Sequence, residues 1–271
     1  MSSYATLNGE TRVLAIIGDP IAQVKAPAGV TQLLNERGRN CVLVPIHVSS
    51  ANLDDFMRGA SLVRNFDGIV VTIPHKFDAY RHCATATECA HFLGAVNTMR
   101  RNADGSWHGD HLDGAGFVGG IRAVGCKPEG QRALMVGAGG AGSAIALALL
   151  EANVAVLAIH DADVGRRDAV VGRLQTRYGD KVSTGSADPT GHTLVVNATP
   201  VGMRTGDPYP VQVEKLTREM FVGDVIAAPA VTPLVEAARV LGCGTQVGGG
   251  MFAAVRDLMV DFLLEAGPLA R

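Results

Sequence analysis

The sequence has no uninterrupted apolar run of 18 residues and no cluster rich in lysine and arginine. The first absence argues against a transmembrane helix. The second, together with a formal net charge of −2, argues against a basic surface for nucleic acid. Residues 1–8 lack the basic and apolar segments of a signal peptide. We therefore expect a cytoplasmic protein that binds neither membranes nor nucleic acid.

Cysteine is scarce, with five residues at scattered positions. An odd and dispersed set favours a reduced protein over a disulfide scaffold. Four residues of types that bind metals, His82, Cys83, Cys89 and His91, fall within ten positions. Their spacing lacks the short C-x-x-C knuckle of structural zinc sites, so no metal site is expected. The G-x-S-x-G motif of many hydrolases is also missing.

What is present is enough apolar sequence, 47% of 271 residues, for one large or two ordinary domains. Short β-branched runs predict strands at 12–17, 41–45, 68–72, 133–136, 154–159, 194–197 and 222–226. Helical patterns between them predict helices at 29–37, 53–61, 79–83, 115–124, 140–152, 166–178, 232–241 and 251–266. This alternation is typical of βαβ units with mostly parallel sheets, which bind ligands at the carboxyl ends of their strands.

A glycine-rich loop follows the predicted strand at 133–136. Gly137 permits a tight turn, Gly139 lets the backbone approach a pyrophosphate, and Gly142 lets the next helix pack closely on the strand. The helix then presents its N-terminal amides to the phosphates. The predicted dinucleotide-binding residues are Gly137, Ala138, Gly139, Gly140, Ala141 and Gly142.

Asp161 lies 19 residues after Gly142, at the end of the second strand of this half. An acid at this place can accept hydrogen bonds from ribose hydroxyls and repels a 2′-phosphate. Arg166 and Arg167 follow only inside the next predicted helix. The pattern therefore favours NAD over NADP as the cofactor. The alternative interpretation is that Asp161 caps the helix near 164–165.

Several further motifs occur in a fixed order along nearly the whole chain. They are Gly-Asp-Pro-Ile-Ala (18–22), Val-Thr-Ile-Pro-His-Lys (71–76), Gly-Ala-Val-Asn-Thr (94–98), Asp-His-Leu-Asp-Gly (110–114), Asn-Ala-Thr-Pro-Val-Gly-Met (197–203) and Gly-Gly-Gly-Met (248–251). Together with the glycine loop, they resemble the shikimate/quinate dehydrogenase family. The resemblance implies an α/β substrate domain at 1–113, a Rossmann-like NAD-binding domain at 114–247, and a cleft between them. A C-terminal helix at 248–271 would return to the first domain.

The resemblance maps the catalytic pair of the family onto Lys76 and Asp113. A lysine in a dry site can take the proton of a secondary alcohol during hydride transfer, and a neighbouring carboxylate can orient the ammonium. His111 would assist this pair or simply form a hydrogen bond nearby, and His75 would lie at the rim of the pocket. The loop after the predicted strand at 194–197 would contact the cofactor through Thr199, Pro200 and Met203, or would be a plain turn.

The chain departs from the family pattern at six substrate-binding positions. Hydroxyl, amide and phenol side chains of the family are replaced here by Val24, Ala26, Val70, Leu112, Ala227 and Val255, while Thr72 and Asn97 remain. A carboxylate buried without donors costs several kcal/mol. Unless Gln23, Lys25 or a bridging water substitutes, these changes predict a substrate less anionic than shikimate or quinate.

We therefore expect an NAD-dependent oxidoreductase that interconverts a ring secondary alcohol and its ketone, as in aromatic amino acid biosynthesis, and that forms a homodimer. The alternative is a non-catalytic NAD-binding sensor or scaffold that kept the fold. Retention of Lys76, Asp113 and Asn97 favours the enzyme, and the lost substrate contacts favour the sensor.

Overall fold

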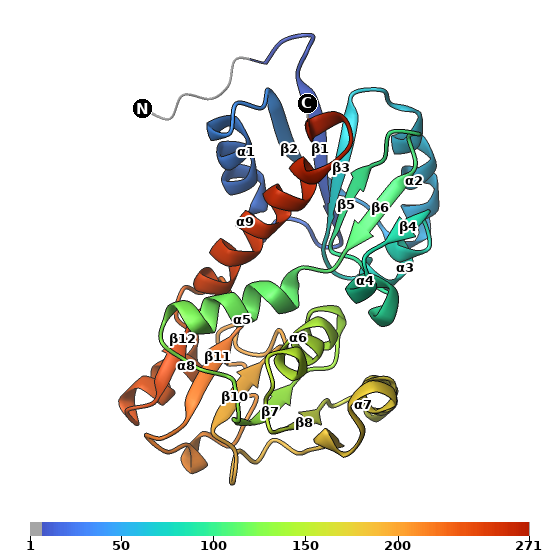
Figure 1. Cartoon of the computed structure of the whole chain (residues 1–271). Helices are drawn as coiled ribbons and strands as arrows, with labels where there is room; N and C mark the ends of the chain where they lie inside the picture. Colours follow the sequence, from blue (N-terminus) through green and yellow to red (C-terminus); the bar gives the residue numbers. More distant parts are fainter. Residues whose placement is uncertain (1–6, 271) are drawn as a thin grey trace. The chain divides into compact units, whose positions relative to one another are not determined.

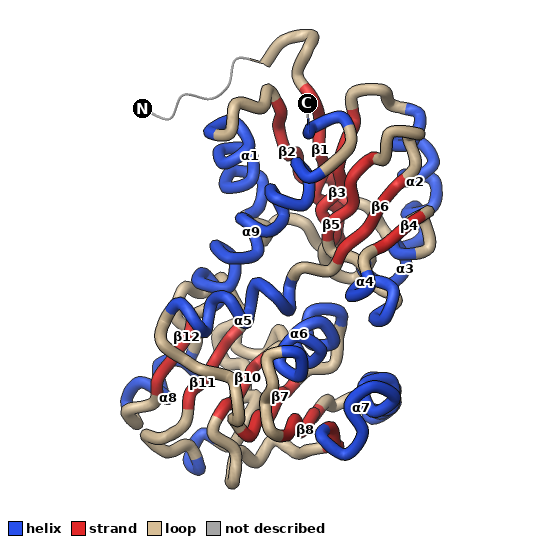
Figure 2. Tube along the Cα trace, in the orientation of Figure 1, coloured by secondary structure: helices blue, strands red, loops and turns tan. Residues whose placement is uncertain are grey.

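The structure is a computed structural model that describes residues 7–270; residues 1–6, part of the segment expected not to be a signal peptide, lie outside the described residues. The chain forms two compact units, one ending at Leu112 and resuming at Arg256, the other running from Asp113 to Val255. Each unit is a single sheet with helices on both faces (Figures 1 and 2). The predicted α/β class is confirmed. Within 7–270 no helix is long and apolar enough to cross a membrane.

The sheet of the first unit is mixed, with strand order β2-β1-β3-β5-β6-β4. Its strands β1, β2 and β3 run parallel, whereas β5 is antiparallel to both β3 and β6. The strands are β1 (Arg12–Gly18), β2 (Cys41–His47), β3 (Phe66–Val71), β4 (Thr85–Ala86), β5 (Thr98–Arg101) and β6 (Trp107–Asp110). The helices are α1 (Ala26–Glu36), α2 (Leu53–Leu62), α3 (Lys76–Tyr80) and α4 (Glu88–Leu93).

The sheet of the second unit is wholly parallel, with strand order β12-β11-β10-β7-β8-β9. Its strands are β7 (Arg132–Val136), β8 (Val156–His160), β9 (Val182–Thr184), β10 (Leu194–Asn197), β11 (Phe221–Asp224) and β12 (Gly244–Gln246). The helices are α5 (Asp113–Ala123), α6 (Gly140–Glu151), α7 (Val164–Tyr178) and α8 (Pro233–Val240). The order reverses at β7 and β10, so this sheet has the switch point at which doubly wound folds bind ligands.

The last helix, α9 (Gly248–Glu265), contributes its residues up to Val255 to the second unit and those from Arg256 to the first. Helix α5 packs against its neighbours through glycines. A Cβ at Gly114 would overlap the carbonyl group of Ala144 in α6, and a Cβ at Gly116 would overlap the side chain of Val255 in α9. These helices therefore approach each other at backbone distance.

Two kinds of element differ from the sequence prediction. The bounds of the helix predicted at 79–83 are wrong, because the helix begins at Lys76 and ends at Tyr80. The chain then turns, and the Ala84 amide donates to the Trp107 carbonyl in β6. The short strands β4, β5, β6, β9 and β12 and the helix α4 were not predicted as elements. Strand β5 carries Arg100 and Arg101, both buried, so it has neither an apolar run nor simple alternation.

Candidate functional site

The glycine loop joins β7 to α6 in the second unit. Gly137 has a φ of 107°, a conformation that side-chain-bearing residues rarely adopt. A Cβ at Gly142 would overlap the carbonyl oxygen of Gly137, whereas a Cβ at Gly139 would meet no atom within 4 Å. The first glycine thus makes the turn, the third lets α6 start against it, and the second leaves open space beside the backbone.

This geometry fits a dinucleotide pyrophosphate. Gly139 is the N-cap residue of α6, and this N-cap residue makes no side-chain cap hydrogen bond to the first amides of the helix. Gly140 and Ala141 form the first turn and are half-buried, while Ala138 is fully buried. An anion beside Gly139 would therefore meet free backbone donors and the positive end of the helix dipole.

The carboxylate of Asp161, directly after β8, is bound by the protein itself. Its Oδ2 accepts a hydrogen bond of 2.7 Å from the Ala138 amide in the glycine loop. Its Oδ1 accepts bonds of 2.8 Å from the Asp163 amide and 3.0 Å from the Arg166 guanidinium. Burial acts to raise the pKa of Asp161, but these donors outweigh it and hold the pKa below its ordinary value.

The first turn of α7 carries two cations, and one of them pairs with this acid. Arg166 is half exposed and pairs with Asp161, and Arg167 bonds to Asp168 at 2.8 Å. The N-cap of α7 is Asp163, whose carboxylate accepts from the Arg166 amide at 3.0 Å. The alternative in which Asp161 caps this helix is therefore wrong, because the residue two positions later does so.

The loops after β10 and β11 are held by a buried polar network. Asn197 Oδ1 accepts bonds of 3.1 and 2.7 Å from the amide and hydroxyl of Thr199. Its amide nitrogen donates to Asp224 at 3.3 Å, and the Asp224 carboxylate also accepts from the Ile226 amide at 2.9 Å and the Thr232 hydroxyl at 2.7 Å. Burial raises the pKa of Asp224, and the donors partly offset this.

This network positions the predicted cofactor loop. Pro200 and Met203 are exposed, and Thr199 is half-buried. Ala227, predicted to border the substrate, is half-buried in the loop that Asp224 anchors. Sequence reasoning missed Asp224 and Thr232 as supporting residues. Aligning the two predicted strands side by side could have identified Asp224 as a partner of Asn197, since the two residues lie opposite each other in the β10–β11 register.

In the first unit, the motifs from 18 and from 71 lie side by side. The Asp19 amide donates to the Ile73 carbonyl at 2.9 Å, and the Thr72 amide donates to the Ile17 carbonyl at 2.9 Å. His75 Nε2 lies 2.7 Å from the Val48 carbonyl oxygen, and this ring is fully buried. His75 is thus a buried residue next to the lysine, and its predicted place at a pocket rim is wrong.

The Val96–Asn97 segment is hydrogen-bonded to the motifs that contain Lys76 and Asp113. The Val96 amide donates to the Lys76 carbonyl at 2.9 Å, and the Asn97 side-chain oxygen accepts from the Leu112 amide at 2.9 Å. Asp113 is the next residue and starts α5. Lys76 is 8% exposed and Asp113 is 7% exposed, so both ionisable groups are removed from water. Charged groups are seldom buried to this extent without a partner or a function.

Four of the six apolar substitutions, at positions 24, 26, 70 and 112, belong to the first unit. Val24 lies just before α1, Ala26 is the first residue of α1, and Val70 is the last but one residue of β3, paired with Ile16 and Thr98. Ala26, Val70 and Leu112 are buried, and Val24 and Thr72 are half-buried. In the second unit, Val255 packs against Gly116, so its side chain already has a structural contact.

His111 lies in the connection between β6 and α5. The two histidines of the cluster at 82–91 have other neighbours: His82 lies 2.9 Å from Asp54, and His91 lies 2.8 Å from the Tyr80 hydroxyl. Among residues 7–270, no group of three His, Cys, Asp or Glu side chains could hold a metal ion.

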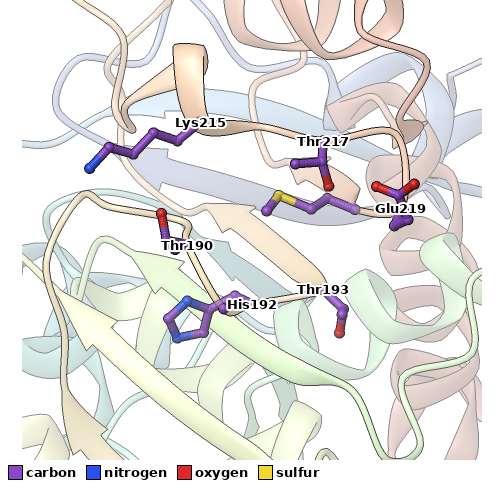
Figure 3. A pocket seen from close by; sticks show the side chains of 8 residues that line it. Thr190, His192, Thr193, Lys215, Thr217 and Glu219 are labelled. Carbon is purple, nitrogen blue, oxygen red and sulfur yellow. The ribbon is translucent and has the colours of Figure 1, made fainter.

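One hollow, of about 510 Å³, lies at the opposite edge of the second sheet, before β10 and β11 (Figure 3). Its side chains come from the segments 190–193 and 215–220. Lys215 is ion-paired with Asp188. Parallel α/β sheets bind ligands at the carboxyl edge, where the glycine loop lies, so we do not assign this hollow to the reaction.

Comparisons with known proteins agree with this arrangement. Residues 16–99 match the profile of the shikimate dehydrogenase substrate binding domain. A shikimate dehydrogenase (NADP(+)) of Rubrobacter xylanophilus is 37% identical over 255 residues, 91% of this chain and 88% of that protein.

Two solved structures have the same fold. A shikimate dehydrogenase in complex with NADP+ is 27% identical, with a TM-score of 0.90 over 97% of this chain and 93% of that chain. The ligand-free 5-ketofructose reductase of Gluconobacter sp. strain CHM43 is also 27% identical, with a TM-score of 0.84 over 97% and 96%.

These relatives overturn the preference for NAD. The Rubrobacter enzyme is named for NADP(+), and the first of the two structures contains NADP+. The physical reason for the error is that an acid after β8 was assumed to face the cofactor, whereas the Asp161 oxygens are engaged by Ala138, Asp163 and Arg166. The predicted resemblance is confirmed: the chain belongs to the shikimate dehydrogenase family.

Proposed function

We propose that this protein catalyses reversible hydride transfer between a secondary alcohol of a polyhydroxylated ring and NADP. The family supports an oxidoreductase of this general class. The observation that carries the assignment to this chain is the Val96–Asn97 segment. It bonds to the Lys76 backbone on one side and to the residue before Asp113 on the other.

In this proposal, Lys76 and Asp113 are the catalytic residues. When bound, the nicotinamide supplies or accepts the hydride. The Lys76 ammonium donates a proton to the carbonyl oxygen during reduction, and the neutral Lys76 amine takes the hydroxyl proton during oxidation. The Asp113 carboxylate orients the hydroxyl and the ammonium. The burial of both groups strengthens their electrostatic effect on charge that develops at the oxygen.

The second unit would hold NADP through the glycine loop and the first turn of α7. Backbone amides at 139–141 would bind the pyrophosphate. The guanidinium groups of Arg166 and Arg167 would bind the 2′-phosphate, because arginine offers planar, paired donors that match phosphate oxygens. Thr199, held by Asn197, would lie against the nicotinamide side of the cofactor.

The substrate would be less anionic than shikimate. At four positions, apolar side chains replace side chains that could donate hydrogen bonds to a carboxylate, and three of these apolar side chains are buried. The four residues are Val24, Ala26, Val70 and Leu112. A relative of the same fold is a 5-ketofructose reductase, and the substrate in its name is a sugar ketone. Thr72 and Asn97 supply polar groups suited to hydroxyls.

The test is a steady-state assay of the purified chain with shikimate, quinate and uncharged cyclic polyols, each with NADP+ and with NAD+. We expect NADP+ to be preferred and an uncharged polyol to have the highest kcat/KM. A high kcat/KM for shikimate would refute the altered substrate. Binding of NADP+ without turnover of any alcohol would favour a sensor, the interpretation supported by the lost donors.

The variant R166Q/R167Q tests the cofactor assignment. Charge-assisted bonds to phosphate contribute enough that NADP+ affinity should fall about tenfold or more, with little change for NAD+. The matched control is R173Q, which removes an arginine further along the same helix. Equal NADP+ affinity in R166Q/R167Q and wild type would exclude these arginines as the phosphate ligands.

A further inference from the structure

Asp161 lies where dinucleotide-binding folds commonly place an acid that reads the ribose. Here, however, both of its oxygens accept hydrogen bonds within the protein: Oδ2 from Ala138, and Oδ1 from Asp163 and Arg166. Only 7% of the residue is exposed. This carboxylate therefore has the surroundings of a structural acceptor rather than those of a ligand-binding group.

We infer that Asp161 is a positioning residue that holds the Gly137–Ala138 turn of the glycine loop in its pyrophosphate-binding conformation and does not itself discriminate between NADP and NAD. The discrimination then belongs to the arginines of α7. This inference deepens the proposed function and rests on it only for the cofactor affinities described below.

The end of β8 holds the turn at two successive residues. The Gly137 amide donates to the His160 carbonyl at 2.7 Å, and the Ala138 amide donates to the Asp161 carboxylate at 2.7 Å. Ala138 is completely buried, so its amide would have no acceptor and no water if the carboxylate were removed. An unsatisfied buried amide is costly, and the turn would shift to relieve it.

The hydrogen-bond donors around Asp161 offset its negative charge, so that a phosphate can bind nearby. The negative charge is shared among two backbone amides and the guanidinium of Arg166. A guanidinium has five N–H donors, and Arg166 is half exposed. It can therefore keep its bond to Asp161 and still present donors to a 2′-phosphate. A lone acid would repel that phosphate, but this paired acid supports the residue that binds it.

The experiment compares D161N with wild type and with D163N, a matched control that removes an acid two positions away. The first readout is hydrogen exchange at individual amides of the cofactor-free protein. We expect the Ala138 amide to exchange at least tenfold faster in D161N only, while the Ser143 amide, bonded to the Gly139 carbonyl within α6, stays protected in all three. Unchanged exchange at Ala138 in D161N would overturn the inference.

The second readout is calorimetric affinity for NADP+ and NAD+, measured well below the unfolding temperature. A positioning role weakens both cofactors together, about tenfold each, and leaves the ratio of the two Kd values within twofold of wild type. A ribose-reading or phosphate-repelling role instead shifts that ratio tenfold toward NADP+. Such a shift would overturn the inference.

A second variant covers the case in which D161N does not fold. R166M removes the cation but leaves the Asp161 oxygens available to both backbone amides. We expect Ala138 to remain protected in R166M, while NADP+ affinity falls and NAD+ affinity is kept. Loss of Ala138 protection in R166M would contradict the inference. Failure of the wild-type protein to bind either dinucleotide would refute the proposed function. Hydrogen exchange at the Ala138 amide would still test the role of Asp161, because it is measured without cofactor.

Discussion

The two units differ in how much of their expected binding chemistry they retain. In the second unit, each glycine of the loop has the steric role that a dinucleotide site requires, and Asn197 and Asp224 hold the neighbouring loops. In the first unit, Lys76 and Asn97 remain, but Val24 and Val70 stand where the family carries polar side chains. The proposed reaction and the proposed substrate choice therefore rest on different residues of this chain.

The difference has a physical basis. A cofactor site depends on backbone amides and glycines, and most substitutions there would create overlap. A substrate site depends on individual side chains that donate to particular groups of one molecule. Replacing such donors by apolar side chains leaves the fold intact and changes only which substrate is bound. The following experiments test this contrast, starting with the largest expected effect.

The variant K76A should lower kcat by about 10³-fold, because general acid–base catalysis contributes about 10²–10⁴-fold. Affinity for NADP+ should be unchanged, since Lys76 belongs to the first unit. Stopped-flow or steady-state kinetics and calorimetry measure the two quantities. The control is K127A, an exposed lysine of the second unit. Turnover within tenfold of wild type in K76A would remove the lysine from the proposed chemistry.

The variants G142A and G139A distinguish a glycine that the loop needs in order to fold from a glycine that it needs in order to bind the pyrophosphate. In G142A, the new methyl group overlaps the Gly137 carbonyl, so we expect about 1–3 kcal/mol of destabilisation and loss of NADP+ binding. In G139A, the methyl group enters open space, so stability should match wild type while NADP+ affinity falls. Thermal unfolding and calorimetry distinguish these results. Unimpaired NADP+ binding in G139A would mean that the pyrophosphate lies elsewhere.

The double variant V24S/A26S returns two hydroxyl groups to the first unit. We expect kcat/KM for shikimate to rise about tenfold, because hydrogen bonds to a charged group contribute about 1.5–3 kcal/mol. Activity toward uncharged polyols should fall or stay constant. The variant V24T/A26G has a hydroxyl at one position only and serves as a partial control. No gain for shikimate would show that the lost serines do not account for substrate choice.

The smallest expected effect is a pH dependence of stability from Asp161. The amides of Ala138 and Asp163 and the Arg166 guanidinium hold the folded-state pKa of Asp161 below its ordinary value, so its stabilising contribution is full above that ordinary value and is lost as the pH falls through the lower folded pKa. The difference in unfolding temperature between wild type and D161N should be greatest at neutral pH and narrow below about pH 4. A difference in unfolding temperature that does not change with pH would exclude ionisation of Asp161 as the source of the stabilisation.

Much of the fold was predictable because the buried parallel strands are short apolar runs separated by amphipathic helices. The strand at 194–197 agrees at both ends with β10, and the strand at 12–17 falls one residue short of β1. Strand β5 was missed because its sequence, Thr-Met-Arg-Arg, looks solvent-exposed. Its Arg101 is buried by bonds to the carbonyls of Phe66, Ala60 and Gly105, which no local pattern reveals.

The candidate site was predictable where a residue acts through the backbone, as in the glycine loop. It was not predictable where one side chain has several possible partners. The spacing of Asp161 matches a ribose-binding acid, but only the three-dimensional structure shows that the Ala138 amide takes up one oxygen. The neighbouring Arg166 and Arg167 were visible in the sequence, and the helix begins early enough to place them in its first turn.

The glycines of α5 have a consequence for the ways in which this protein can change. A side chain at position 114 or 116 would push α5 away from α6 or α9, so few substitutions are tolerated directly after Asp113. Positions 24, 26, 70 and 112 accept apolar side chains without such overlap. A library that varies these four residues and keeps the α5 glycines would therefore sample new substrates while most of its members still fold.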